Sequence, residues 1–225
     1  MAGEGFSREE REAVYRAIAE RRDVRRGYLP EPLADETLWR ILEAAHCAPS
    51  VGLMQPWRFI VIRDREVRAA VHANFVRANE AAQQSYEGER AEQYSGLKLE
   101  GILEAPQNLC VVCDPSSIQG HRLGRHTMRE TALYSAVCAV QNLWLAARAE
   151  GVGVGWVSIL DLHVLQQTLQ IPDGIIPIAY LCLGYVDRFA AEPELEKAGW
   201  ERRTRLESVV SFERYDARWK AGVRP

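Results

Sequence analysis

The spacing of apolar residues along the first third of the chain predicts two helices followed by a loop. Ser7 and Glu10 form an S-x-x-E capping box, and apolar residues follow at spacings of three and four, so a first amphipathic helix should end near Arg22. The same spacing predicts a second helix with Asp35 as its cap. Pro49 disfavours helical geometry in the residue before it, so the segment APSVGLMQP is predicted to be a loop.

The rest of the chain alternates predicted strands with predicted helices. Extended segments are expected at 57–62, 108–113, 151–160 and 175–186. Helices are expected at about 64–82, at 128–150, and from a capping Asp161 to a point before Pro172. Because the segment 175–186 is apolar throughout, it is the candidate for the central strand. The polar, weakly periodic segment 83–101 is expected to form a mobile flap.

These elements predict one α/β or α+β domain. The chain has 225 residues, of which 47% are hydrophobic and 26% charged, and this composition supports a core without disulfides or metal. It contains no internal repeat and no low-complexity linker. We therefore expect a single domain over 1–225, ending in a polar C-terminal extension at 193–225 that contacts a partner subunit.

The net charge and the apolar segments argue against several kinds of partner. Lys and Arg number 28 against 31 Asp and Glu, so the formal charge is −3 and no strong positive field attracts nucleic acid. The longest apolar stretch, 175–186, contains a proline and is shorter than the ~20 residues of a membrane-spanning helix. The N-terminus does not resemble a secretory signal. We expect a cytoplasmic protein with no nucleic-acid or membrane partner.

The cysteines and histidines indicate neither disulfides nor a metal site. Five cysteines, an odd number spread through apolar segments, favour buried reduced thiols. Cys110 and Cys113 form a C-x-x-C, but side chains three apart in a strand point to opposite faces, so we interpret them as two packed thiols. The five histidines lack metal-ligand spacing with cysteines or carboxylates, and no metal is expected.

Two short motifs resemble known functional loops without matching them. Gly151, Gly153 and Gly155 follow a predicted helix and precede an extended run, which is the reverse of a Rossmann dinucleotide site. Such glycines more readily let a backbone come close to a flat ligand or to another strand. Ser50 lacks the first glycine and the preceding strand of a serine-hydrolase elbow, so a hydrolase is a distant alternative.

The most unusual local feature is the sequence RRDVRR, in which four arginines surround Asp23 at the predicted end of the first helix. Such a cluster is often an ordinary solvated surface. Guanidinium groups at a chain turn also bind phosphate through paired, charge-assisted hydrogen bonds, which makes a phosphorylated small molecule a reasonable ligand. Further basic candidates are Arg122, Arg125, Arg202, Arg203 and Arg205.

Three segments, in this order and spacing, resemble the nitroreductase-like flavoprotein family: RRDVR, APSVGLMQPWRF and SAVCAVQNLWLAARAEGVGVGWVSI. With LKLEGI and LCLGYVDR, they are similar to a branch of the family that breaks down its own flavin. The resemblance implies an α+β three-layer sandwich, with a central, mostly antiparallel sheet and helices on both faces. It implies a homodimer with FMN at the subunit interface. It also implies that reduced FMN and O2 are converted to 5,6-dimethylbenzimidazole, the lower ligand of vitamin B12, and erythrose 4-phosphate.

The resemblance further implies roles for single residues. Asp23 stands where ordinary nitroreductases usually have Ser, and it and Ser158 match positions needed for flavin fragmentation. Asp23, kept ionised by the arginines, would act as a base or orient a proton relay, and Ser158 would hydrogen-bond the flavin or an intermediate. The implied FMN-binding residues are Arg21, Arg22, Asp23, Val24, Arg25, Pro49, Ser50, Val51, Gly52, Arg90, Leu99, Ser158 and Arg203. The segment 87–102 would close over the flavin as a lid and exclude water.

Two other functions stay open at this point. The family also contains NAD(P)H-dependent flavin and nitro reductases, and the arginine cluster alone is compatible with a noncatalytic FMN-binding protein. Bulky Leu53 and Met54 stand where many nitroreductases carry a small or amide residue, and a crowded pocket suits O2 better than a nicotinamide ring. No dedicated nicotinamide site is visible, so we expect reduced flavin to arrive from a separate NAD(P)H:flavin reductase.

Overall fold

The computed structural model describes residues 5–215, which form two compact units. The first runs to Ala191 and the second begins at Glu192, next to the predicted start of the C-terminal extension. The end of the predicted extension, 216–225, lies outside the described residues, and the assignment of one domain with an extension stays a prediction.

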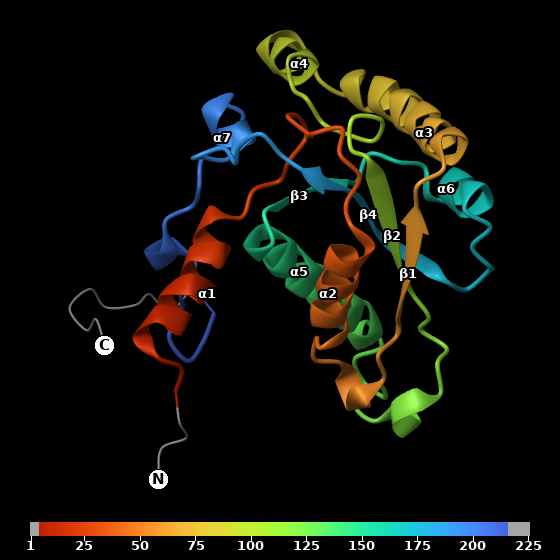
Figure 1. Cartoon of the computed structure of the whole chain (residues 1–225), viewed down its shortest axis with the longest axis vertical. Coiled ribbons are helices and arrows are strands. Elements are labelled where there is room, and N and C mark those ends of the chain that lie inside the picture. The colour runs from red at the N-terminus through yellow and green to blue at the C-terminus, as the bar shows by residue number, and fades with distance from the viewer. Residues whose placement is uncertain (1–4, 216–225) are drawn as a thin grey trace. The chain divides into compact units, whose positions relative to one another are not determined.

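A four-stranded antiparallel sheet forms the centre of the described part of the first unit (Figure 1). Its strands are β1 (Trp57–Ile62), β2 (Gln107–Cys113), β3 (Val152–Val157) and β4 (Ile176–Tyr185). They lie in the order β1-β2-β4-β3, and each neighbouring pair is antiparallel. The bounds predicted for β1 are confirmed, and the apolar β4 lies inside the sheet as predicted.

Helices cover both faces of this sheet, which confirms the predicted three-layer α+β sandwich. One face packs against α2 (Asp35–His46) and α5 (Thr131–Ala149), and the other against α3 (Arg65–Gln83) and α6 (Leu162–Thr168). Residues of β2 alternate between the two layers, because successive strand side chains point to opposite faces. Cys113 accordingly lies in the layer of α2 and α5, and Cys110 in the layer of α3 and α6.

Local sequence signals set the start of some of the helices. The capping box of α1 (Arg8–Glu20) is confirmed, since Ser7 Oγ accepts from the Glu10 N–H and the Glu10 carboxylate accepts from the Ser7 N–H. The predicted Asp161 cap of α6 is confirmed as well. The predicted Asp35 cap is wrong, because Ala34 is the N-cap of α2 and Asp35 is its first residue. There the carboxylate stabilises the helix through its dipole.

The segment predicted to be a flap contains a helix, α4 (Gly88–Ser95). Its polar sequence hides one aromatic anchor: Tyr94 is buried, stacks on Tyr86 with ring centroids 4.8 Å apart, and donates its hydroxyl to Asn79 Oδ1 at 2.8 Å. A single anchor does not produce an apolar period, so the sequence pattern could not reveal the helix. The closing motion of this segment stays a prediction.

The cysteines are free, and three of them are buried as expected, namely Cys110, Cys113 and Cys182. Cys47 is exposed, which corrects the expectation that all the thiols are buried. It follows α2, at the point where the chain leaves the helix for the loop, so its side chain is not covered by the core.

Short elements complete the described chain. The turns η1 (Val51–Leu53) and η2 (Gln119–Arg122) belong to the first unit, and α7 (Glu194–Lys197) and η3 (Leu206–Ser208) belong to the second. Within residues 5–215, no helix is both long and apolar enough to cross a bilayer.

Candidate functional site

The chain that follows α1 packs directly against strand β3. The Val24 N–H donates to the Val154 carbonyl oxygen at 3.0 Å, and Asp23 pairs with Val154 in an isolated parallel bridge. A Cβ atom on Gly155 would lie only 2.0 Å from the Val24 carbonyl oxygen. Gly155 is therefore required for this close approach of two backbones, which was one of the two alternatives for the glycine run.

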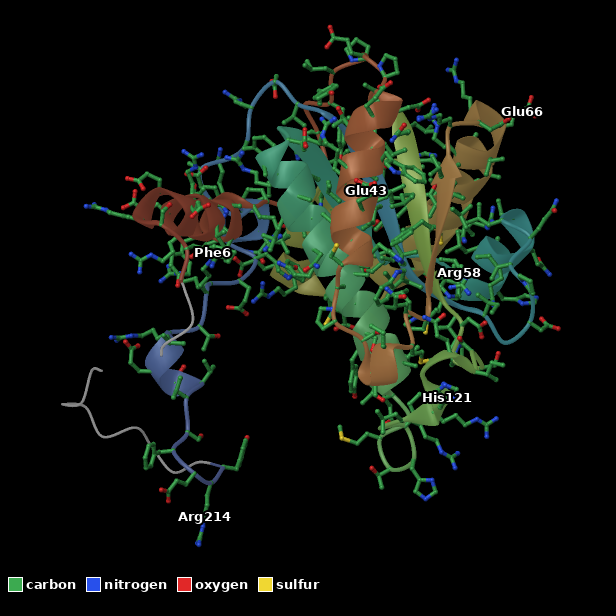
Figure 2. All side chains as sticks on the ribbon, turned by 60° about the horizontal axis from the view of Figure 1, so that its bottom comes forward. Phe6, Glu43, Arg58, Glu66, His121 and Arg214 are labelled. Carbon is green, nitrogen blue, oxygen red and sulfur yellow. The ribbon has the colours of Figure 1, made fainter. Side chains whose placement is uncertain are left out.

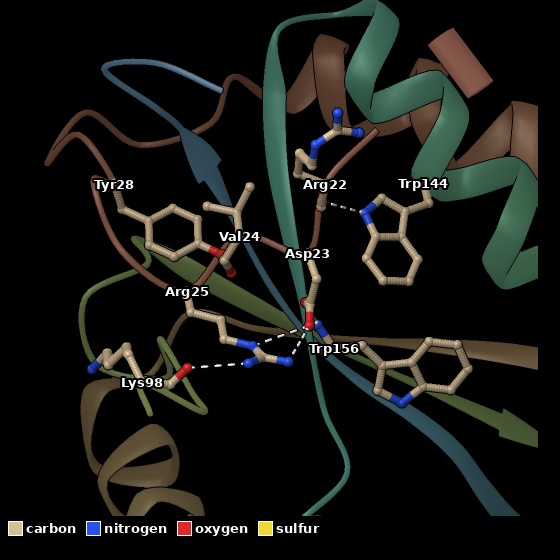
Figure 3. Close-up of polar contacts among 8 residues, drawn as sticks. All are labelled: Arg22, Asp23, Val24, Arg25, Tyr28, Lys98, Trp144 and Trp156. Carbon is tan, nitrogen blue, oxygen red and sulfur yellow. Dashed lines mark hydrogen bonds and ion pairs between the residues drawn. The ribbon is translucent and has the colours of Figure 1, made fainter. Parts of the chain in front are cut away.

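Asp23 is held by three hydrogen bonds (Figure 3). Its Oδ1 accepts from the Trp156 N–H at 2.9 Å, and its Oδ2 accepts from Arg25 Nε at 3.0 Å and Nη2 at 2.6 Å. The Asp23 side chain is 30% exposed and that of Arg25 is 14% exposed. The carboxylate is thus oriented by charge-assisted donors and can still be reached by a ligand, which suits a proton acceptor or a group that orients a proton relay.

The two arginines before Asp23 have different surroundings. The Arg21 guanidinium carbon lies 4.5 Å from the centre of the Trp144 ring, a cation–π contact. Arg22 donates to the carbonyl oxygens of Ala19, Arg21 and Ala191. Arg22 Nε is buried and has no hydrogen-bond partner among the described residues. A buried donor without a partner, inside a cluster of cations, fits an anionic ligand group such as a phosphate.

Ser158 lies just past the end of β3 and is exposed. It stands two residues after Trp156, whose N–H binds Asp23, and two residues of extended chain span roughly 6–7 Å. The Trp156 N–H that binds Asp23 therefore lies close along β3 to Ser158, and the roles of both residues stay predictions. Trp156 is half-buried and its ring lies 6.1 Å from the ring of Trp144, which adds aromatic surface of the kind a flat ligand contacts.

The second group of predicted flavin residues, in the loop 49–52, lies at the other end of α5. The Val51 N–H donates to Ser135 Oγ at 3.1 Å, near the start of α5, whereas the Arg22 carbonyl oxygen accepts from Trp144 Nε1 at 3.2 Å, near its end. These two positions are separated by about 13 Å along the helix axis. Figure 1 shows the two segments apart, near opposite ends of α5. One chain therefore does not bring Ser50 and Asp23 together.

The loop itself is held mainly through its backbone. Ser50 Oγ accepts from the Gln55 N–H at 3.0 Å, and a Cβ on Gly52, which has φ +55°, would lie 2.9 Å from the Leu123 carbonyl oxygen. Figure 2 shows the neighbouring turn η2, which carries His121, beside this loop. Leu53 is 71% exposed, whereas Met54 is buried in the core. Of the two bulky residues expected to crowd a pocket, only Leu53 is on the surface.

The other residues predicted to bind FMN lie in other segments of the chain. Arg90, in α4, donates to Gln93 Oε1 at 3.2 Å, and Leu99 is half-buried against the apolar layer of α3 and α6. Arg203 belongs to the second unit, where its Nε lies 3.9 Å from a carboxylate oxygen of Glu196. Their roles in binding FMN stay predictions.

Tyr28 is a residue of this region that the sequence analysis missed. Its hydroxyl lies 2.8 Å from the Val24 carbonyl oxygen and 3.1 Å from that of Cys182, so it fixes the segment that carries Asp23. Burial raises the pKa of the Tyr28 hydroxyl well above its ordinary value, so it remains a neutral donor. No sequence pattern indicated it; in the structure, Gly101 and Gly184 make room for its ring, because a Cβ on either would lie within 3.1 Å of the Tyr28 ring.

Comparisons with known proteins agree with the family resemblance of the sequence motifs. The sequence pattern of the nitroreductase family matches residues 18–185. A 5,6-dimethylbenzimidazole synthase of Rhodospirillum rubrum is 47% identical over 183 residues, which cover 81% of this chain and 86% of the relative. A 5,6-dimethylbenzimidazole synthase of Rhodobacter capsulatus is 40% identical over 196 residues, which cover 87% and 94%. Among solved structures, oxidized iodotyrosine deiodinase bound to FMN and 3-iodo-L-tyrosine aligns with a TM-score of 0.70 and 22% identity, over 88% of this chain and all of that one, and so shares the fold.

Proposed function

This chain belongs to the nitroreductase family, and from that premise we propose that it is a 5,6-dimethylbenzimidazole synthase. Such an enzyme uses O2 to fragment reduced FMN into 5,6-dimethylbenzimidazole and erythrose 4-phosphate, and so supplies the lower ligand of vitamin B12. Relatives with this name are 40% and 47% identical over most of the chain. The motifs RRDVR and GVGVGWVSI, which resemble BluB-type synthases, are the segments that meet around Asp23.

The observation that carries the proposal is the carboxylate of Asp23. Breaking the ribityl chain of a flavin requires proton removal, and a nitroreductase that only passes electrons has no need of a base at this position. Arg25 holds Asp23 Oδ2, and the backbone of Trp156 holds Oδ1. Asp23 then accepts a proton at a carboxylate oxygen or orients a proton relay to Ser158. Reduced FMN, as the substrate, supplies the electrons for O2 and the atoms of both products.

The residues around Asp23 fit the other parts of FMN. Arg21 and Arg22 would hold the phosphate and ribityl end, for which the unpaired Arg22 Nε is the structural support. Ser158 and the aromatic surface of Trp156 would contact the flavin ring. We propose that residues 87–102 close over this site and exclude water, and that a separate NAD(P)H:flavin reductase delivers the reduced flavin.

We further propose that the active form is a homodimer, in which the loop 49–52 of one copy completes the site around Asp23 of the other. The separation of these two groups along α5 supports this arrangement. Helix α1 buries none of its residues, and Val14, Tyr15 and Ile18 are exposed at neighbouring positions of that helix. Exposed apolar groups of this kind are typical of subunit contacts. A monomer in sedimentation at micromolar concentration would contradict the dimer.

The direct test mixes the purified protein with photoreduced FMN and then air, without nicotinamide, and detects products by chromatography with mass detection. We expect a dimethylbenzimidazole peak, whereas full recovery of FMN contradicts the proposal. Steady oxidation of NAD(P)H with FMN surviving many turnovers would instead indicate a flavin or nitro reductase.

The matching variant is Asp23→Asn, with the exposed Asp173→Asn as control. Loss of the proton acceptor is expected to lower the product yield at least about 100-fold, while FMN still binds. An equal yield in Asp23→Asn and the control would remove Asp23 from the mechanism.

A further inference from the structure

A cluster of three charged side chains lies next to Arg25, in and just after the segment 87–102 that is proposed to close over the site. Lys98 Nζ lies 2.7 Å from Glu100 Oε1 and 2.6 Å from Glu104 Oε1. Glu100 is only 8% exposed, and its Oε2 accepts from the Ile102 N–H at 2.7 Å. We call Lys98, Glu100 and Glu104 the Lys98 cluster.

The Lys98 cluster stands at the point where the α4 segment returns to the core. Helix α4 ends at Ser95, and Ile102, seven residues later, is fully buried. The ammonium of Lys98 pairs with a carboxylate that is almost enclosed, and removing it would take away the cation that offsets the burial of Glu100. Burial opposes the charge of Lys98, but hydrogen bonds to Glu100 and Glu104 outweigh it and raise the pKa of Lys98, so the cluster keeps its cation.

Arg25 connects this cluster to Asp23, as Figure 3 shows. Arg25 Nη1 donates to the Lys98 carbonyl oxygen at 3.1 Å, while Nε and Nη2 of the same guanidinium hold Asp23. The backbones are also in close contact, since a Cβ on Gly101 would lie 3.3 Å from the Arg25 carbonyl oxygen. A shift of the backbone at Lys98 therefore removes one hydrogen bond from Arg25 and changes how it holds the carboxylate.

We propose that Lys98 is a positioning residue, and that the Lys98 cluster fixes the base of the α4 segment so that Arg25 holds Asp23 in the orientation that fragmentation needs. The inference rests on the proposed function. It predicts a change in the fate of the flavin: when Asp23 is misplaced, bound reduced FMN and O2 give intact FMN and hydrogen peroxide, with two electrons and two protons passing to O2, in place of dimethylbenzimidazole.

The test measures this partition in a single turnover for Lys98→Met and Glu100→Gln. Since a misplacement of about 1 Å can cost about 100-fold, we expect the fragmented share to fall at least about 10-fold, with the remaining flavin recovered as FMN. The affinity for FMN, measured by its fluorescence, should change less than about 3-fold because Arg21 and Arg22 are intact. Lys98→Arg keeps the cation and should restore fragmentation. Arg40→Met, which breaks the Arg40–Glu150 ion pair on another part of the chain, is the matched control.

Unchanged partition in Lys98→Met overturns the proposal. So does parallel loss of FMN binding and of folded protein without rescue by Lys98→Arg, since that pattern indicates a purely structural role. If the wild type forms no dimethylbenzimidazole, the proposed function has failed, and the anchoring is then tested separately by amide hydrogen exchange of 88–95. Faster exchange there in Lys98→Met than in Arg40→Met supports the anchor, and equal exchange overturns it.

Discussion

The two ends of helix α5 carry the two groups of residues predicted to bind flavin, and they are built in different ways. Near Trp144, the carboxylate side chain of Asp23 is fixed at both oxygens, by the Arg25 guanidinium and by the Trp156 N–H of β3. Near Ser135, the loop 49–52 is held mostly through backbone groups, and its neighbour Leu53 is 71% exposed. The first end can orient a reacting group, whereas the second presents a surface for something else to cover.

The difference suits the two ends to different tasks: the Asp23 end to orienting a reacting group, and the loop 49–52 to lining a ligand. A carboxylate that moves protons must be held within narrow limits, which the hydrogen bonds around Asp23 provide. A surface that lines a flat ring needs shape and apolar contact, for which a backbone-anchored loop is sufficient.

The largest effect is expected for Gly155→Ala, at the Asp23 end. The new Cβ would meet the Val24 carbonyl oxygen at 2.0 Å, so either β3 or the segment that carries Asp23 must move. We expect the free energy of unfolding in urea to fall by about 3 kcal/mol, together with loss of FMN binding. The control is Gly96→Ala, whose Cβ would meet its nearest neighbour, the Gln93 carbonyl oxygen, at 3.5 Å. Equal stability of the two variants would refute the close packing of the Asp23 segment on β3.

A smaller effect is expected for Ser135→Ala, at the loop end. The substitution removes the hydroxyl that accepts from the Val51 N–H and donates to the Thr131 carbonyl oxygen. Stability should fall by about 1 kcal/mol, measured by thermal or urea unfolding, because the Val51 N–H loses its acceptor and the Thr131 carbonyl oxygen loses one donor. FMN affinity should fall while the fragmented share of bound flavin stays the same. Ser85→Ala, at an exposed position just after α3, is the control, and a changed share in Ser135→Ala alone would show that the loop takes part in the chemistry.

The smallest effect concerns the thiols. Cys47, close to the loop, is exposed, and burial raises the pKa of Cys110 to about 12 and that of Cys113 to about 11. At pH 8 a thiol reagent should therefore label Cys47 quickly and leave the buried thiols unreacted until the protein unfolds. Labelling followed by peptide mass analysis checks this, with Cys47→Ser as control. Rapid labelling of Cys110 or Cys113 in the folded protein would contradict their packing.

The sequence predicted the layers of the fold better than it predicted the details of the site. Strand β1 was predicted to the residue because its apolar run is bounded by turn signals, and the C-x-x-C was placed correctly because strand side chains alternate. Helix α4 was missed because one buried tyrosine anchors it. The N-cap of α2 was wrong because an acidic residue favours both the cap and the first turn.

The contacts around Asp23 could not be predicted from the sequence and are seen only in the structure. The family motifs indicated Asp23 and Ser158, but a sequence does not show that Lys98, 73 residues after Arg25, contributes a carbonyl oxygen to that arginine. Long-range contacts of this kind depend on how strands and loops pack, which local patterns do not encode. In the same way, the sequence motifs did not show that the loop 49–52 lies far from Asp23 within one chain.

The most direct test of the two-end arrangement combines two inactive variants in one dimer. Asp23→Asn disables the first end, and Val51→Glu places a charge on the loop at the second. If the loop of one copy completes the Asp23 site of the other, each mixed dimer contains one intact site. Co-expressed variants should then form dimethylbenzimidazole at about a quarter of the wild-type rate, since half of the dimers are mixed and each has one of two sites. No product from the mixture, with mixed dimers confirmed by native mass spectrometry, would show that both ends must act within one chain.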